Sequence, residues 1–147
     1  MIPPSLFSRN AYEKNGNIGE VILLENDVQC IINKIKDGLC SNKELCYYLE
    51  SKLVLIKANA ILKIIDSQNK EMDIIYSLNN LSKKVEQEPI VFSIWNTGHF
   101  AMAALKILDT DVSLALFENN FKKLDKVIQQ DIEDLIEYLK KAPIQEL

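Results

Sequence analysis

Residues that form turns, ligate metals or make disulfides are scarce in this sequence. Four glycines and four prolines in 147 residues argue against a turn-rich all-β fold. The three cysteines, Cys30, Cys40 and Cys46, form no CxxC pair, and with one histidine there is no zinc-ligand set. We therefore expect reduced cysteines on helices, as in a reducing cytoplasm, and neither a metal nor another cofactor.

Long apolar runs and targeting signals are also absent from the sequence. No apolar run approaches the roughly 18 residues of a membrane span, and the N-terminal MIPPSLF lacks the basic and apolar regions of a signal peptide. The net charge is −4, whereas nucleic-acid binding needs a basic face. These absences predict a cytoplasmic protein with no membrane partner and no nucleic-acid partner.

Two stretches of the chain repeat each other at a fixed offset of 43 residues. Lys57–Asp66 reads KANAILKIID and Phe100–Asp109 reads FAMAALKILD, with six identical positions in ten. Internal periods of about 40–47 residues are typical of HEAT and armadillo helical repeats, which this pattern resembles. Alanines at alternate positions let another helix approach closely, so we expect Ala60 and Ala103 to be buried at matching helix–helix contacts.

The apolar periodicity and the repeat together predict an all-α fold. We expect a single helical-repeat domain over all 147 residues, built as a short right-handed, α-solenoid-like stack of about seven or eight helices. After an irregular lead at 1–16, the predicted units cover about 27–66, 70–109 and 111–141. Residues 17–25 are expected to form a short helix, and a short strand is the alternative.

Each of the first two units is expected to contain a long helix, a short helix and an alanine-rich helix. The short helix of the second unit is predicted at 90–95, with Thr97 as the N-cap of the helix that follows. Ser41 with Glu44 predicts a capping box, and Asp111 is the expected cap of the third unit.

Motifs of known enzyme classes are missing from the sequence. There is no GxSxG, P-loop, GxGxxG or HExxH pattern, and His99 is the one histidine. We therefore expect no catalytic residue and no enzyme activity, a small enzyme being the least favoured alternative. His99 is either a contact or acid–base residue or a partly buried capping residue. Trp95 is either a core residue or an exposed anchor for a partner.

The final predicted helix carries a run of acids without nearby bases. Apolar residues cover one side of this helix, whereas Asp131, Glu133, Asp134 and Glu137 cover the other. No lysine four residues further on is expected to offset their charge. The run is either an ordinary solvated face or a negative patch that steers a basic partner, with Tyr138 beside it.

Helical-repeat stacks present extended surfaces that bind other macromolecules, so we expect a non-catalytic protein-binding module. The acidic helical domain, rich in Ile, Lys and Asn, resembles the immunity proteins of bacterial toxin–immunity pairs. The resemblance implies a small cytoplasmic inhibitor that covers the active site of a basic nuclease toxin. The alternative is a helical-repeat scaffold or adaptor protein of another pathway. The expected partner is thus another protein, of basic charge. The residues expected to contact it are Asp131, Glu133, Asp134, Glu137, Tyr138, Trp95 and His99.

Overall fold

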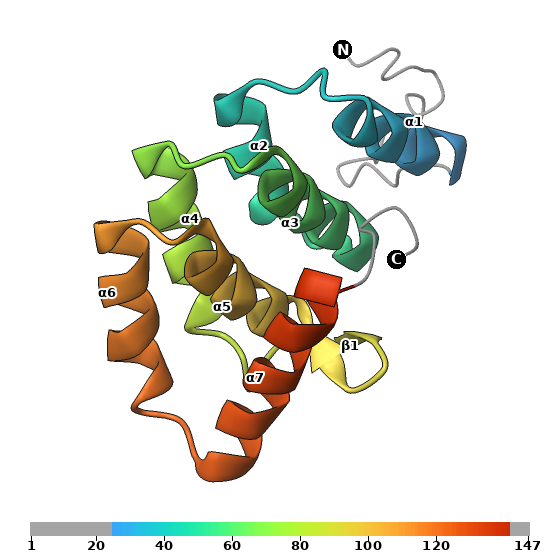
Figure 1. The fold of residues 1–147 in the computed structure, drawn as a ribbon. Coiled ribbons are helices and arrows are strands. Elements are labelled where there is room, and N and C mark those ends of the chain that lie inside the picture. The colour runs from blue at the N-terminus through green and yellow to red at the C-terminus, as the bar shows by residue number, and fades with distance from the viewer. Residues whose placement is uncertain (1–24, 142–147) are drawn as a thin grey trace.

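The computed structural model describes residues 25–141, which form helices and one small β-hairpin (Figure 1). The expected irregular lead at 1–16 and all but the last residue of the expected helix at 17–25 lie outside the described residues, as do residues 142–147. The helices are α1 (Glu25–Lys36), α2 (Asn42–Leu49), α3 (Val54–Ser67), α4 (Met72–Ser82), α5 (Thr97–Leu108), α6 (Asp111–Phe121) and α7 (Lys126–Lys141). The hairpin strands are β1 (Ile90–Phe92) and β2 (Trp95–Asn96), between α4 and α5.

The helices are stacked in two rows (Figure 1). In one row α1 contacts α3, α3 contacts α5, and α5 contacts α7. In the other row α2 contacts α4, and α4 contacts α6. Contacts of α2 with α3, and of α4 with α5, join the rows into consecutive helix pairs. The predicted all-α fold is therefore confirmed, with the hairpin as the sole β-structure in the part of the chain that is described.

Helix α5 lies at the centre of this stack and contacts α3, α4, α6 and α7. Ten of its twelve residues are buried, which is why its sequence is apolar almost all round. Ala103 in α5 and Ala60 in α3 both have 0% exposure and belong to the same core. Their predicted burial is confirmed. Small side chains at these positions let helix backbones approach closely.

The short helix predicted at 90–95 is wrong, because these residues form the hairpin. β1 and β2 are antiparallel, with Ile90 opposite Asn96 and Phe92 opposite Trp95. Apolar and β-branched side chains favour strands, and a proline directly before β1 suits the start of a strand as well as a helix start. Ser93 takes a left-handed backbone conformation, with φ of 57°, at the turn between the strands.

The caps predicted for α2 and α6 lie within one residue of those in the structure. Ser41 and Glu44 form the expected capping box at the start of α2, so this prediction is confirmed. Thr110, rather than Asp111, caps α6, because its side chain accepts the hydrogen bond from the Ser113 backbone N–H at 2.9 Å. Asp111 instead occupies the first helical turn, where a negative charge is favourable beside the helix dipole.

Candidate functional site

The hairpin is attached to the helices by an ion pair at its base. The Lys57 ammonium in α3 donates to the Glu88 carboxylate at 2.7 Å, and the Thr97 hydroxyl in α5 donates to the same oxygen at 2.8 Å. The side chains of Lys57 and Glu88 are only 10% and 13% exposed. Burial by itself raises the pKa of Glu88, but these hydrogen bonds and the lysine charges outweigh it and hold the pKa below its ordinary value. Glu88 therefore links α3 and α5 to the start of the hairpin through hydrogen bonds to its charged carboxylate.

The other end of the hairpin is fixed by the N-terminal cap of α5. The Asn96 side-chain oxygen accepts from the His99 backbone N–H, and the Asn96 backbone N–H donates to His99 Nδ1, both at 3.0 Å. Asn96 is thus the N-cap, and the prediction of Thr97 as the cap is wrong by one residue. Asn96 has the extended backbone that an N-cap requires, while Thr97 is already helical.

A close backbone approach holds the start of α5 against the segment before the hairpin. The Asn96 amide nitrogen donates to the Val85 carbonyl at 2.6 Å and to the Glu88 carbonyl at 3.1 Å. A Cβ on Gly98 would lie 2.5 Å from the Val85 Cα, so only glycine fits this position without a shift of the backbone. Both ends of the hairpin are therefore fixed to the helical core.

His99 acts in this structure as a buried capping residue. Because its Nδ1 accepts a hydrogen bond, the proton of the neutral ring resides on Nε2. Nε2 is buried and has no hydrogen-bond partner among the described residues. Burial lowers the pKa of His99, and the nearby charge of Asp131 opposes this in part. His99 therefore stays neutral near pH 7, and its described contacts serve the fold.

The hairpin presents apolar side chains to solvent. Ile90 is 64% exposed, Ile94 is 51% exposed, and Phe92 is partly exposed; we call these three residues the hairpin surface. Leu55, at the start of α3, is 57% exposed and lines the same pocket as Phe92. The hairpin and the start of α3 therefore leave several apolar side chains in contact with solvent.

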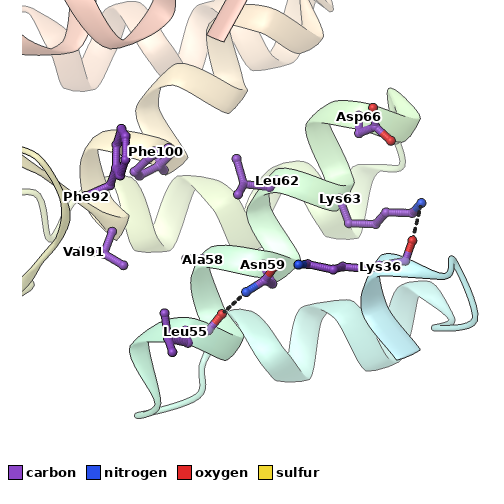
Figure 2. Close-up of a pocket in the computed structure, with 10 residues that line it drawn as sticks. All are labelled: Lys36, Leu55, Ala58, Asn59, Leu62, Lys63, Asp66, Val91, Phe92 and Phe100. Carbon is purple, nitrogen blue, oxygen red and sulfur yellow. Dashed lines mark hydrogen bonds between the residues drawn. The ribbon is translucent and has the colours of Figure 1, made fainter. Parts of the chain in front are cut away.

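Beside the hairpin lies a pocket of about 290 Å³ between α3, β1 and α5, with the last residue of α1 at its rim. We call it the α3 pocket. Figure 2 shows phenylalanine side chains at one end and lysine side chains at the other. Its lining residues are Lys36, Leu55, Ala58, Asn59, Leu62, Lys63, Asp66, Val91, Phe92 and Phe100.

The polar end of the α3 pocket has two lysines and one aspartate. The Lys63 ammonium donates to the Lys36 backbone carbonyl at 3.2 Å, which satisfies a carbonyl at the C-terminal end of α1 (Figure 2). Neither Lys36 nor Lys63 forms an ion pair with a carboxylate of the described residues. Asp66 is the one acidic residue of the lining. This end of the pocket therefore has a net positive charge.

Two of the predicted contact residues, Trp95 and Tyr138, lie next to this region. Their ring centroids are 5.7 Å apart, and each lies near the ring of Phe92, at 6.1 and 5.8 Å respectively. Trp95 is buried, and its indole N–H donates to the Asp131 backbone carbonyl at 2.8 Å, so it ties β2 to α7. Tyr138 is half-buried. The aromatic trio thus joins α7 to the wall of the α3 pocket.

The predicted acidic face of α7 is smaller than its sequence indicates. Glu133, Asp134 and Glu137 are exposed, while Asp131 is half-buried. The prediction that no lysine offsets these acids is wrong for Glu137, because Lys141 lies 3.8 Å from its carboxylate, four residues further along the helix. Glu133 and Asp134 have no ion pair with any described residue.

Sequence reasoning missed the residues that make the hairpin surface and the polar end of the pocket. The apolar run from Ile90 to Phe92, followed by Ile94, lies within the short helix that the sequence predicts at 90–95. The signal for a strand was its β-branched composition between Pro89 and the cap at Asn96. No sequence signal marked Lys36 and Lys63, because they meet only through the packing of α1 on α3.

Comparisons with known proteins give no relative. No protein-family model matches the chain, and no curated protein or solved structure is significantly similar to it. Within residues 25–141, no group of three or more His, Cys, Asp or Glu side chains is placed to hold a metal ion. In the same range no helix is both long enough and apolar enough to cross a membrane.

Proposed function

We propose that this protein is a non-catalytic protein-binding module whose partner docks on the hairpin surface and the α3 pocket. The observation that carries the proposal is an apolar hairpin, fixed at both ends, beside a pocket with one apolar and one basic end. The two rows of helix pairs support the resemblance to HEAT-type repeats, a class whose stacked helices bind other macromolecules.

The anchoring of the hairpin favours binding over a passive surface loop. The Lys57–Glu88 ion pair and the Asn96 cap hold the exposed isoleucines in place before any partner arrives. A surface that is already ordered loses less conformational freedom when it binds, so more of the contact energy appears as affinity. Ile90 and Ile94 also gain from leaving water, since burial of apolar area stabilises a complex.

Affinity capture from extracts of the source cell tests the proposal. The bait is the wild-type protein, an Ile90→Asp/Ile94→Asp variant, or a Tyr47→Asp variant that changes an apolar side chain on α2 exposed to 73%. We expect a partner that wild type and Tyr47→Asp retain and the double variant loses. A partner that all three baits retain equally would place the interface elsewhere, and capture of no specific partner would count against a binding module.

We propose an immunity-type inhibitor of a basic toxin as a second candidate function, in which α7 meets the partner. The observation that favours it is the exposed pair Glu133 and Asp134, which no described cation neutralises. Such a patch raises the association rate with a basic partner, and salt weakens the effect. Glu133→Lys/Asp134→Lys should slow association and flatten its dependence on ionic strength. Equal salt dependence for both proteins would leave this surface as a solvated helix face.

A further inference from the structure

We propose that the α3 pocket binds a protein segment in which an acidic side chain stands close to a bulky apolar one. This inference rests on the proposed function and names the chemistry of the partner. The apolar side chain would enter between Leu62, Phe92 and Phe100, and the carboxylate would bind the Lys36 ammonium, which points towards Asn59 (Figure 2).

The apolar end of the pocket fits a side chain better than a whole small molecule. Its volume of about 290 Å³ lies at the lower limit of small-molecule sites, which span roughly 300–1,000 Å³. Apolar side chains are also exposed outside the pocket lining, at Ile90 and Ile94 of the hairpin. A protein segment can place one side chain in the pocket and cover the surrounding residues with its neighbours.

The polar end of the pocket is complementary to a carboxylate. The chain as a whole has a net charge of −4, yet this end combines Lys36 and Lys63 with Asp66 alone. The Lys63 ammonium is held in position by the Lys36 carbonyl, and the described residues supply no ion-pair partner to either lysine. A carboxylate from outside the chain would form a charge-assisted hydrogen bond with the Lys36 ammonium, and the positive charge of Lys63 would add to the attraction.

The α1–α3 contact determines this arrangement. Lys36 is the last residue of α1, and its carbonyl would lack a helical partner without the Lys63 ammonium. Figure 2 shows the Lys63 ammonium at the end of α1 and the Lys36 ammonium pointing towards Asn59, with the phenylalanines at the opposite end of the pocket. A basic partner segment would meet repulsion here, so the charge of the lysines selects against it.

A displayed library of random 12-residue peptides provides the probe for this inference. We expect the wild-type protein to enrich peptides that place Asp or Glu within a few residues of Leu, Ile, Phe or Trp. Synthetic versions of these peptides should bind Phe92→Asp and Lys36→Glu at least about tenfold more weakly, because each change removes one half of the recognition. Lys43→Glu, an equal charge change on α2, should leave affinity within about twofold. Unchanged far-ultraviolet circular dichroism checks that each variant is folded.

The outcomes separate this inference from the proposed function. Peptides that need Phe92 but show no acidic preference, and that bind Lys36→Glu normally, overturn the inference and leave the binding module intact. Failure to enrich any peptide that depends on Phe92 overturns both. Sedimentation of the free protein as a dimer that Phe92→Asp dissociates would assign the pocket to a second copy of the chain, which also overturns the proposal.

Discussion

At the scale of single residues, the start of α5 depends on the protonation state of His99. The Nδ1 atom of His99 accepts a hydrogen bond from the Asn96 backbone N–H. A proton on Nδ1 would abolish this hydrogen bond and would place two N–H groups against each other. Nε2 is buried without a described partner, so the charged ring would also lack solvation there. The neutral ring is therefore the form that the folded state prefers.

This preference makes stability depend on pH through one group. Burial lowers the pKa of His99 below its ordinary value of 6.5, so the unfolded chain binds the proton more readily. The stabilisation that neutral His99 gives the folded state is fully present above about pH 6.5. It is lost as the pH falls towards the pKa of His99 in the folded state. We expect wild type to lose more free energy of unfolding than His99→Gln between about pH 7.5 and about pH 5.5 in urea titrations. Glutamine can keep the capping box but does not titrate. Parallel profiles for the two proteins would contradict this.

Packing at Ala103 provides a second residue-scale prediction. Ala103 has no exposed surface and lies in α5, the helix that contacts α3, α4, α6 and α7. Ala103→Leu should destabilise the fold by about 1–3 kcal/mol, because the added atoms must displace packed neighbours. Ala115→Leu on the exposed side of α6 is the matched control and should change stability by no more than about 0.5 kcal/mol. Similar melting temperatures for both variants would show that the space around Ala103 accommodates a larger side chain.

At the scale of elements, the hairpin depends on a buried ion pair, whereas α1 and α2 share an exposed one. Lys57–Glu88 and Lys34–Glu44 have almost equal lengths, 2.7 and 2.8 Å, but the second pair is 41% exposed on each side. Removing one partner of a buried pair leaves the other charge without solvation. Removing one partner of an exposed pair returns the other to water.

Matched substitutions of the two lysines test this difference. Lys57→Met should cost about 3–5 kcal/mol, because the largely buried Glu88 carboxylate keeps only the Thr97 hydrogen bond and the charge of Lys84. Lys34→Met should cost no more than about 1 kcal/mol. Urea unfolding of both variants measures the difference. Equal costs would mean that solvent reaches Glu88 freely and that the hairpin does not depend on the pair.

The elements that sequence reasoning identified are those whose signals are local. The capping box of Ser41 and Glu44 needs only residues three apart, and the apolar stripe of α7 repeats within one helix. The hairpin was missed because its stabilising contacts are distant in sequence, from Lys57 to Glu88 and from Trp95 to Asp131. The alignment of the repeat also favoured a helix, where strand propensity and those contacts favour a hairpin.

The candidate site was predictable only in part for the same reason. The sequence indicates Trp95 by its side-chain type and Tyr138 by its place beside the acidic run, and the structure places both against Phe92. Lys36 and Lys63 are ordinary surface lysines in the sequence. They form the polar end of a pocket only because α1 packs on α3 and the hairpin closes the other side.

At the scale of the whole molecule, the stack has a centre and an edge. Among the described helices, α5 contacts four others, whereas α1 packs on α3 and shares the exposed Lys34–Glu44 ion pair with α2. In stacked-helix proteins stability is close to a sum over neighbouring units, so a helix with fewer contacts to the described core can open while the rest stays folded. The polar end of the α3 pocket includes the last residue of α1, so opening of α1 would also remove part of the proposed binding site.

Native-state hydrogen exchange tests this gradient of stability. We expect the slowest amides of α5 to exchange only through global unfolding, and those of α1 to exchange at least about tenfold faster through local opening. Low urea concentrations should accelerate α5 exchange strongly and α1 exchange weakly, because global unfolding exposes more surface. Ala103→Leu supplies the control, since it should speed exchange in α5 while leaving local opening of α1 unchanged. If α1 and α5 exchanged at one common rate with one urea dependence, the described helices would unfold as a single cooperative unit. The α1 side of the pocket would then open with the same free energy as its α5 side.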